Sequence, residues 1–378
     1  MGFTLLQVTP RLDGGGVERV TLDTAAAVVR AGGRSLVASR GGTLADALGR
    51  EGSLLFRLPV DSRNPLVQAV NTARLAMLIR RERVSLVHVR SRAPAFSAIP
   101  AARIAGVPVV ATYHGVYSAR GPLKRWYNGV MTRADLTIAN SRFTRDHVAT
   151  EHGLGDDRLA IAAEGVDTDR FDPAQVSAER IAALRSIWSD GAGGPVLLLA
   201  ARLTGWKGQA TAIEALARLK AFPSARLVLA GKAEKPGAVD ALLARIARAG
   251  VAGRVILAGA VEDMPAAYAA ADLVLAPSTL AESFGRGVVE AGAMGRVVLT
   301  SPLGGPGETV IDGVTGRLVA AGDARAWADA MAETLALPED ARARMGAAAR
   351  AHVTARYSLE AMMSETFAIY RRLLAARA

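Results

Sequence analysis

Two glutamates, Glu282 and Glu290, flank a glycine-containing segment, and this spacing could hold hydroxyl groups on either side of a phosphate. The apolar run 272–278 before them predicts a buried strand that ends in a proline-serine turn. Residues 288–294 predict a helix start, with Glu282 in the loop and Glu290 about two turns into the helix. The backbone N–H groups of Phe284–Gly287 would be unpaired there, and the start of a helix favours an anion. The segment suits a ligand of sugar, phosphate and ribose, although two solvated glutamates at an ordinary junction would give the same pattern.

Two basic residues, Arg202 and Lys207, form a second candidate binding group. They follow the predicted buried strand 194–201, in a loop that also contains glycine. Two cations at the carboxyl end of a strand can clamp a diphosphate. The alternative is that both side chains simply lie on the surface, but the glycines and the strand edge favour a binding loop.

The first half opens with a strand, a glycine loop and a helix, the first unit of a doubly wound α/β domain. The apolar run Phe3–Thr9 predicts the strand, Gly14–Gly16 form the loop, and residues 17–30 have helical apolar spacing. Such a loop could hold a phosphate, or it could be no more than a tight turn. A dinucleotide fingerprint needs a third glycine where Arg19 stands, which argues against a nicotinamide or flavin cofactor.

A histidine, His114, follows the predicted strand 107–112 and therefore lies at the carboxyl end of a sheet. Ligands of open α/β sheets bind at that edge, so His114 is a candidate site residue. The alternative is a structural histidine whose ring is satisfied by hydrogen bonds within the protein.

The basic segment 120–133 predicts a helix that carries Arg120, Lys124 and Arg125 together with Trp126 and Tyr127. This mixture is typical of a helix that contacts an acceptor or a membrane interface. We slightly prefer the alternative, a basic helix that packs its aromatic side chains inward. The three cations are weak candidates for the acceptor side of a site.

Strand and helix signals alternate along the rest of the chain. The predicted strands include 35–39, 84–88, 136–139, 161–164, 225–231, 255–259, 272–276 and 296–300. The predicted helices include 64–83, 93–105, 209–220, 240–249, 327–335, 341–352 and the segment from 359 onward, and residues 268–271 are predicted to close a further helix. Because 378 residues exceed the size at which one core usually divides, we expect two α/β domains.

Composition narrows the class of protein. The chain has no cysteine, which excludes a disulfide framework and thiol chemistry. We find no signal peptide and no apolar run near the ~20 residues of a membrane span, so we expect a soluble or peripheral protein. Aromatic residues make up only 5%, without basic-aromatic alternation, which argues against nucleic acid as a partner.

The net charge of +11 is unevenly distributed. Residues 1–165 contain 22 lysines and arginines against 13 acidic residues, whereas residues 166–378 contain 24 against 22. A basic first half fits an anionic partner such as acidic lipid headgroups or a phosphorylated glycan. Ordinary solubility of an arginine-rich protein is the alternative.

The linker 165–173 contains an Asp-x-Asp pair, Asp167 and Asp169. Such a pair holds a divalent metal on nucleotide phosphates in some sugar-transfer enzymes. Here it lies beside the expected domain boundary and away from a strand end, so we expect no metal site.

Taken together, these residues resemble the retaining family-4 glycosyltransferases (glycosyl transferases group 1), whose GT-B fold has two Rossmann-like doubly wound domains facing a cleft. The resemblance covers nearly the whole chain and is carried by Gly14–Arg19, His114–Gly115, Gly165–Phe171, Arg202 with Lys207–Gly208, and the Glu282/Glu290 pair. The visible departure is Glu164, where the family usually has asparagine.

The resemblance implies domain limits. Residues 1–165 would form an N-terminal, acceptor-side domain, and residues 175–355 a C-terminal, nucleotide-sugar-binding domain. The last helix, about 359–378, would cross back to the first domain. The nucleotide sugar would sit mostly on the second.

The resemblance also implies functional roles. The catalytic set would be His114 beside the transferred sugar, Glu282 on the sugar and phosphate, and Arg202 with Lys207 on the diphosphate. Glu290 would bind the ribose hydroxyl groups. The remaining donor-binding residues would be Gly15, Gly16, Val261, Glu262, Met264, Phe284, Gly285 and Arg286.

The implied reaction is transfer of a glycosyl group with retention of anomeric configuration. Arg202, Lys207 and the helix start would stabilise the departing diphosphate in place of a metal ion, so no metal and no cofactor are expected. The diphosphate itself can take the acceptor proton. We therefore expect His114 to orient the sugar and not to act as the base.

The expected partners are a nucleoside diphosphate sugar and a glycan or glycolipid acceptor, as in lipopolysaccharide or exopolysaccharide assembly. An anionic membrane surface is a further candidate, which would place the protein in the cytoplasm or on the inner face of the cytoplasmic membrane. Alternatives are a glycoside phosphorylase of related architecture, a nicotinamide-dependent sugar-nucleotide enzyme, and a non-catalytic membrane-surface binding protein. The donor base, sugar and acceptor are not determined by these residues.

Overall fold

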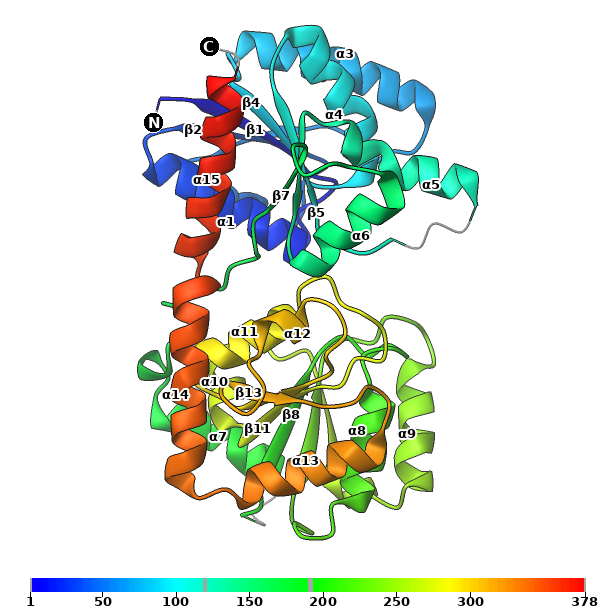
Figure 1. Ribbon diagram of the computed structural model, residues 1–378, viewed down its shortest axis with the longest axis vertical. Helices are drawn as coiled ribbons and strands as arrows, with labels where there is room; N and C mark the ends of the chain where they lie inside the picture. The colour runs from blue at the N-terminus through cyan, green and yellow to red at the C-terminus, as the bar shows by residue number, and fades with distance from the viewer. Residues whose placement is uncertain (1, 118–120, 190–192, 377–378) are drawn as a thin grey trace. The chain divides into compact units, whose positions relative to one another are not determined.

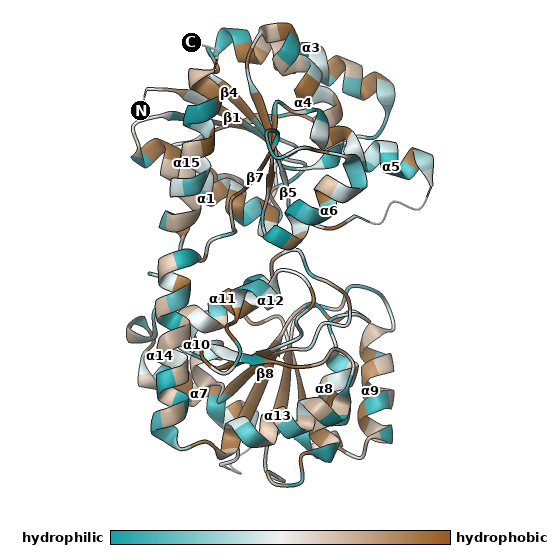
Figure 2. Ribbon diagram, in the orientation of Figure 1, coloured by the Kyte–Doolittle hydropathy of each residue, from teal (hydrophilic) through white to brown (hydrophobic). Residues whose placement is uncertain are grey.

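The computed structural model describes residues 2–117, 121–189 and 193–376. The chain forms two compact units, one of Met1–Gly165 with Leu359–Ala378 and one of Val166–Ser358. Each unit contains one parallel β-sheet with helices on both faces (Figure 1). The predicted fold class, two doubly wound α/β domains, is confirmed. Apolar residues concentrate in the strands of both sheets, and the hydrophilic residues lie mostly on the outer faces of the helices (Figure 2).

The first sheet has the strand order β3-β2-β1-β4-β5-β6-β7, and all neighbouring strands pair in parallel. Its strands are β1 (Thr4–Val8), β2 (Arg34–Ser39), β3 (Leu54–Arg57), β4 (Leu86–Val89), β5 (Val109–Tyr113), β6 (Leu136–Ala139) and β7 (Leu159–Ile161). The chain order reverses between β1 and β4. Loops that follow strands on the two sides of such a point diverge and leave room for a ligand.

Helices cover both faces of the first sheet. They are α1 (Gly16–Arg30), α2 (Ala45–Arg50), α3 (Pro65–Arg81), α4 (Arg92–Ala105), α5 (Pro122–Asn128), the 3₁₀ helix η1 (Gly129–Arg133), α6 (Arg142–His152) and α15 (Leu359–Ala375). Because side chains alternate along a strand, Leu6 and Val8 face the core shared with α3 and α4, whereas Leu5 faces the core shared with α15.

The second sheet has the order β10-β9-β8-β11-β12-β13, again with parallel pairs throughout. Its strands are β8 (Val196–Ala200), β9 (Arg226–Ala230), β10 (Val255–Gly259), β11 (Leu273–Ala276), β12 (Val298–Thr300) and β13 (Gly316–Leu318). Here the order reverses between β8 and β11. The loops after these two strands are therefore the expected ligand loops of this unit.

The helices of the second unit are α7 (Ala178–Ser189), α8 (Gln209–Arg218), α9 (Ala238–Arg248), α10 (Met264–Ala270), α11 (Arg286–Ala293), α12 (Pro306–Thr309), α13 (Ala324–Ala336) and α14 (Glu339–Arg356), with short 3₁₀ helices η2 (Pro173–Gln175) and η3 (Ala252–Arg254). One core packs the sheet against Ile213 of α8 and Trp327 of α13. On the other side, α7 packs against α10, and α11 against α14.

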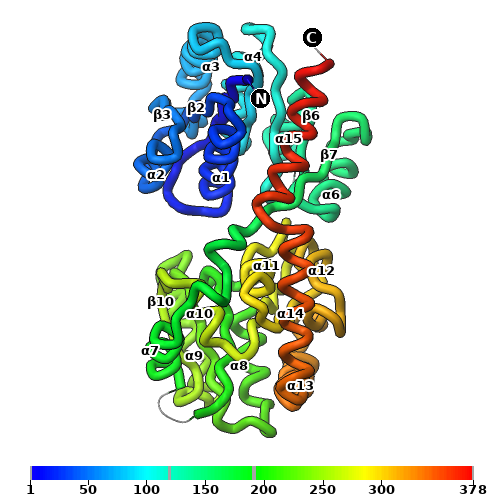
Figure 3. Tube along the Cα trace, turned by 90° about the vertical axis from the view of Figure 1, so that its left-hand side faces the viewer, coloured from blue at the N-terminus to red at the C-terminus, as the bar shows by residue number. Residues whose placement is uncertain are grey.

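The helix α15 follows the second unit in sequence but belongs to the first. Ile369 and Tyr370 of α15 are buried against Phe3 and Leu5, and α15 runs beside α1 (Figure 3). The predicted return of this helix to the N-terminal unit is confirmed. Among the described helices, none has an apolar stretch of the length required to traverse a bilayer.

Two predicted elements are wrong in position. The strand predicted over 161–164 is β7 at Leu159–Ile161, because the N–H of Ala163 donates to Glu365 of α15 and leaves the sheet ladder. The long helix predicted over 120–133 is the short α5 followed by η1, with Gly129 at the junction. Residues 118–120 lie outside the described residues.

Candidate functional site

The loops after β8 and β11 meet at the reversal point of the second sheet. The N–H of Thr279, after β11, donates to the carbonyl of Trp206, after β8, at 2.8 Å. Gly208 begins α8 with φ +75°, and a Cβ there would collide with the carbonyl of Pro277. Only glycine therefore allows these two loops to approach so closely.

Lys207 and Glu282 form an ion pair across these loops. Lys207 Nζ lies 2.5 Å from Glu282 Oε2, and the side chains are only 17% and 13% exposed. The hydroxyl of Ser278 donates to the other oxygen of Glu282. Lys207, Ser278 and Glu282 line one hollow together with Tyr268 and Gly285. The structure therefore brings together one predicted cation and one predicted carboxylate.

The backbone of Glu282 is held by the glycine-rich loop after β12. The N–H of Gly305 donates to the carbonyl of Glu282 at 2.9 Å, and the N–H of Glu282 donates to Leu303 at 3.3 Å. A Cβ at Gly304, which has φ +80°, would collide with the carbonyl of Glu282. This loop fixes Glu282 relative to the start of α11.

Glu290 lies one turn into α11, and the predicted two turns are wrong because α11 begins at Arg286. Its oxygens accept hydrogen bonds from Arg286 Nε at 3.0 Å and from the Tyr268 hydroxyl at 3.1 Å. Burial, and then the negative charge of Glu290, raise the pKa of Tyr268 well above its ordinary value. Tyr268 thus stays protonated and donates to Glu290. Neither Tyr268 nor Ser278 was predicted as a site residue, since nothing in their spacing marks them.

The start of α11 is shaped by Gly285, which has φ +87° and lies against Pro306. A side chain at Gly285 would strain the backbone and clash with the proline ring. Phe284 before it is buried against Tyr357, with ring centroids 5.8 Å apart. Phe284 and Gly285 thus present backbone N–H groups at a rigid helix start, which favours an anion.

Arg202 takes a different partner from Lys207. Its Nη1 lies 2.6 Å from Glu234, and the two side chains are 60% and 40% exposed. An exposed pair of this kind contributes at most about 1 kcal/mol, so a phosphate could replace Glu234. The structure does not bring the side chain of Arg202 together with Glu282.

The predicted donor-binding residues Val261, Glu262 and Met264 are not among those that line the Lys207 hollow. Glu262 lines a separate hollow of about 760 Å³, which includes Arg180 and Asp169. Met264 is the first residue of α10, because Asp263 caps that helix by accepting from Ala266 N at 3.2 Å. Of these three predicted donor-binding residues, Met264 therefore lies in a helix.

The Asp-x-Asp pair of the linker forms a turn. Asp167 Oδ1 accepts hydrogen bonds from the backbone N–H groups of Asp169 and Arg170 at 3.1 and 3.0 Å. Its carboxylate is thus engaged in capping the chain segment that follows. Among the residues that the structure describes, no group of three histidine or acidic side chains is placed to hold a metal ion.

In the first unit, the glycine loop follows β1. Gly14 has φ +101°, Gly15 caps α1, and a Cβ at Gly16 would meet nothing within 4 Å. The carboxylate of Glu18 lies against Gly15. This negative charge at the helix start favours the hydroxyl groups of a sugar over a phosphate at the loop.

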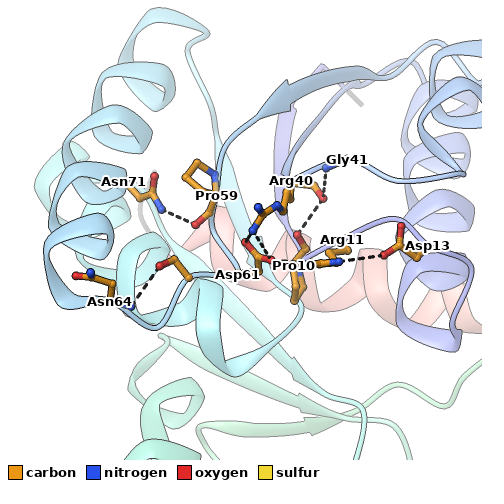
Figure 4. Close-up of polar contacts among 11 residues, drawn as sticks. Pro10, Arg11, Asp13, Arg40, Gly41, Pro59, Asp61, Asn64 and Asn71 are labelled. Atoms are coloured by element: carbon orange, nitrogen blue, oxygen red, sulfur yellow. Dashed lines mark hydrogen bonds and ion pairs between the residues drawn. The ribbon is translucent and has the colours of Figure 1, made fainter. Parts of the chain in front are cut away.

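A polar network holds the chain that enters this glycine loop (Figure 4). Arg11 Nε and Arg40 Nη1 both bind Asp61 Oδ2, at 3.2 and 3.3 Å. Arg11 also lies 3.9 Å from Asp13, and the Ser39 hydroxyl donates to the carbonyl of Pro10 at 3.3 Å. The segments after β1, β2 and β3 are thus joined at the carboxyl edge of the sheet.

His114 also lies at this edge, at the end of β5. Its Nδ1 is 3.0 Å from Glu164 Oε1, and its side chain is 4% exposed. Asn140 donates from Nδ2 to the same oxygen of Glu164 at 2.9 Å. Ser141 alone caps α6, by accepting from Thr144 N at 3.0 Å. Glu164, noted in the sequence only as a departure, is thus the partner of His114.

The acceptor-side candidates lie on and before α5. Arg125 pairs with Glu151 at 2.9 Å, and Lys124 is exposed, while Arg120 lies outside the described residues. The aromatic side chains do not both pack inward as preferred: Tyr127 stacks on Phe96, whereas Trp126 is 54% exposed. The indole still has protein neighbours, because its ring centroid lies 5.2 Å from that of Phe96 and 5.1 Å from Arg133 Cζ.

The two units match known families and structures. The family described as Glycosyltransferase Family 4 matches residues 14–170, and the family described as Glycosyl transferases group 1 matches residues 183–352. A crystal structure of a glycosyltransferase from Rickettsia africae ESF-5 is 30% identical, with 99% of each chain covered and a TM-score of 0.90. The chain belongs to the family-4, group 1 glycosyltransferases. This glycosyltransferase has the GT-B fold, as predicted.

Two further proteins that resemble this chain have names or titles that mention a ligand or substrate. The glycosyltransferase is 25% identical to Anabaena HepE, solved in complex with UDP-glucose, with a TM-score of 0.85 and 98% and 100% of the two chains covered. It is 36% identical over 226 residues to a D-inositol 3-phosphate glycosyltransferase from Xylanimonas cellulosilytica. That match covers 59% of this chain and 53% of the relative. The chain thus spans about half the length of this curated relative.

Proposed function

We propose that this glycosyltransferase moves a sugar from a nucleoside diphosphate sugar to a hydroxyl group of a glycan or glycolipid, with retention of configuration at the anomeric carbon. The observation that carries the proposal is the half-buried Lys207–Glu282 pair, which lines one hollow with Gly285 at the start of α11. A cation beside free helix amides suits a diphosphate, and a fixed carboxylate suits sugar hydroxyl groups. Glu290, held by Tyr268 and Arg286, would accept from the ribose hydroxyl groups.

The diphosphate gains negative charge as the glycosidic bond breaks. Lys207 and the N–H groups of Phe284 and Gly285 would stabilise that charge, and Arg202 would join them by exchanging Glu234 for phosphate. We infer that these groups do the work of a metal ion. The acceptor oxygen attacks the face that the diphosphate leaves, and its proton passes to the diphosphate. His114 orients the transferred sugar.

The donor and acceptor are proposed from the relatives. Because Anabaena HepE was solved with UDP-glucose, we place a UDP-sugar first among donors. The name of the Xylanimonas relative adds a phosphorylated inositol to the acceptors that deserve testing, beside the glycolipids of lipopolysaccharide assembly. The basic first half, with 22 lysines and arginines against 13 acidic residues in 1–165, favours an anionic acceptor.

We also propose that the protein acts at the inner face of the cytoplasmic membrane. On α5, Leu123 is 82% exposed and Trp126 54% exposed, and Lys124 and Arg125 lie between them in sequence. Tryptophan and basic side chains together favour the interface of an anionic bilayer. A glycolipid acceptor would be reached from that surface.

A donor screen followed by a transfer assay tests the proposed function. Thermal unfolding is measured with UDP-, GDP- and ADP-sugars, since a ligand at 100 times its Kd stabilises the folded state by about 2.7 kcal/mol. We expect one nucleotide class to raise Tm and to release its nucleoside diphosphate when an acceptor is added. Glycolipid and inositol phosphate acceptors are compared in parallel.

The competing functions predict different results. Cleavage of a glycan that requires inorganic phosphate would indicate a glycoside phosphorylase. Retention on anionic vesicles without stabilisation by any sugar nucleotide would indicate a non-catalytic binding protein. Either result, in the absence of nucleoside diphosphate release, contradicts the proposed transfer.

A further inference from the structure

A buried carboxylate, Glu164, joins three loops at the carboxyl edge of the first sheet. Its Oε1 lies 3.0 Å from His114 Nδ1 after β5 and accepts from Asn140 Nδ2 after β6 at 2.9 Å, while Glu164 itself follows β7. The side chains of His114 and Glu164 are 4% and 11% exposed. Water therefore competes little for this contact, and the ring has a fixed neighbour on its Nδ1 side.

The chemistry of a carboxylate sets the direction of the hydrogen bond. An ionised carboxylate has no proton to give, so His114 Nδ1 must carry the hydrogen and donate it to Glu164. In the neutral ring, Nε2 is then a hydrogen-bond acceptor. An amide in place of Glu164 offers both a donor and an acceptor, so it would allow either tautomer. A glutamate at position 164, where the family usually has asparagine, thus selects one tautomer of His114.

Glu164 also has a buried counter-charge. Arg90, at the end of β4, binds Gln7 at 2.7 Å and Thr24 at 2.7 Å. Burial lowers the pKa of Arg90, whereas Tyr370, Glu164 and Asp23 act to raise it. The Arg90 cation therefore offsets the negative charge that an ionised Glu164 brings into this poorly hydrated region.

We propose that Glu164 is a positioning residue that holds His114 in the Nδ1–H tautomer and in one ring orientation, so that Nε2 remains an acceptor for a hydroxyl group of the transferred sugar. The proposal rests on the proposed function for its catalytic meaning. Its structural content, a single tautomer imposed by one carboxylate, stands by itself and is measurable without substrate.

The tautomer is read from nitrogen chemical shifts of ¹⁵N-histidine-labelled protein, with His114 assigned by comparison with His114→Ala. We expect the Nδ1–H tautomer in the wild type. In Glu164→Gln, which keeps the size of the side chain but removes its charge, we expect a mixture of tautomers. An Nε2–H tautomer in the wild type overturns the proposal, whether or not any variant folds.

Kinetics then test the consequence for catalysis. We expect Glu164→Gln to lower kcat roughly 10- to 100-fold, by analogy with the loss of hydrogen-bond partners of metal-bound histidines. The donor KM should change little, because the diphosphate contacts lie elsewhere. Glu164→Asp retains the charge but shortens the side chain. Its fraction of the Nδ1–H tautomer should therefore lie between that of Glu164→Gln and that of the wild type.

A double-variant cycle separates positioning from a general structural role. If Glu164 acts through His114, His114→Ala combined with Glu164→Gln should be no slower than His114→Ala alone. Losses that multiply would overturn the proposal, as would an unchanged kcat in Glu164→Gln. Lack of transfer by the wild type would refute the proposed function and leave the tautomer result standing.

The matched control is Glu82→Gln. Glu82 is also a paired carboxylate of the first unit, 3.0 Å from Arg34 and 2.9 Å from Arg81, but it follows α3 at the other edge of the sheet. We expect wild-type kcat and an unchanged His114 signal in this variant. A signal change in both variants would indicate a general loosening of the unit and count against a specific role of Glu164.

Discussion

Lys207 is the residue at which we expect the loss of one charge to lower kcat most directly. Its ammonium group lies 2.5 Å from Glu282, in a pair with little exposure to water. We predict that Lys207→Met lowers kcat by roughly 10²–10³, because an electrostatic donor to the departing diphosphate is removed. The measurement is steady-state release of nucleoside diphosphate.

The control for this variant is Lys220→Met. Lys220 is exposed and follows α8, so it lies at the amino edge of the second sheet, away from the hollow. It should retain wild-type activity. Equal losses in both variants, or an undiminished rate in Lys207→Met, would remove Lys207 from the proposed mechanism.

At this scale, spacing in the sequence predicts neighbourhoods better than partners. Lys207 and Glu282 follow the two strands at the reversal point, and parallel strands bring such loops together. Arg202 shares the loop of Lys207, yet its side chain pairs with Glu234. His114 and Glu164 are 50 positions apart in the sequence. Their contact depends on how the strands pair, which local sequence patterns do not predict. The catalytic roles assigned to Lys207, Glu282, Arg202 and His114 stay predictions.

At the scale of elements, strong apolar runs made most strands and helices predictable within one or two residues. The elements that went unmentioned, such as β3, β13 and α7, carry weak signals. The ends of β3 are exposed at the sheet edge, β13 has three residues, and α7 buries only Trp188. Where burial is partial, periodicity fades and tertiary packing decides the structure.

The helix α5 provides a test of membrane contact. We predict that the protein floats with phosphatidylglycerol vesicles and that replacing Leu123 and Trp126 by serine weakens this binding, since both side chains are exposed. Vesicle flotation measures the bound fraction. Ile187→Ser, at a 68% exposed residue of α7, is the matched control.

Two outcomes would contradict this prediction. Equal binding of the wild type to anionic and to phosphatidylcholine vesicles would show that the basic residues of α5 have no part in binding. Equal weakening by the α5 changes and by Ile187→Ser would show that any exposed apolar residue suffices.

The junction of β4, β5 and α15 predicts an acid sensitivity. His88 Nδ1 lies 2.5 Å from the Tyr370 hydroxyl and Nε2 lies 2.7 Å from the Thr112 hydroxyl. Burial, followed by the charges of Arg90 and His114, lowers the pKa of His88 well below its ordinary value. In the unfolded chain histidine titrates near 6.5, so on acidification the unfolded state binds a proton first. The free energy of unfolding therefore falls below about pH 6.5, until the folded pKa is passed.

Urea unfolding between pH 8 and pH 5 measures this dependence. A single such histidine contributes a slope of up to about 1.4 kcal/mol per pH unit. We predict a shallower slope in His88→Gln, whatever its stability at neutral pH. His152 and His352, whose pKa values burial also lowers, contribute equally to both proteins. Parallel slopes for wild type and variant would contradict the assignment to His88.

At the scale of the whole molecule, the second unit is inserted into the first. Its two ends are adjacent, because the N–H of Val166 donates to Tyr357 at 2.7 Å and Val166 bridges Ser358. The first unit continues on both sides of this insertion, and the N–H of Gly165 contacts the sulfur of Met362. Each unit thus has its own buried core, but only the second has a continuous sequence.

This organisation predicts unequal behaviour of fragments. Residues 166–358 alone should fold cooperatively, whereas residues 1–165 alone should expose the apolar surface that Ile369 and Tyr370 cover. Circular dichroism measures the cooperative unfolding of each fragment, and binding of a hydrophobic dye measures its exposed apolar surface. Joining 1–165 directly to 359–376 should restore the first unit, and a well-folded 1–165 fragment would contradict the prediction.

The late position of α15 in the chain has a consequence during synthesis. A ribosome adding roughly 5–20 residues per second needs about 10–40 s to pass from Gly165 to Leu359. Throughout that interval the nascent N-terminal sheet lacks α15 over part of one face, beside α1, while the inserted unit can finish folding. The cell must shield that face from other nascent chains, so demand for chaperones should track the delay before α15 emerges from the exit tunnel.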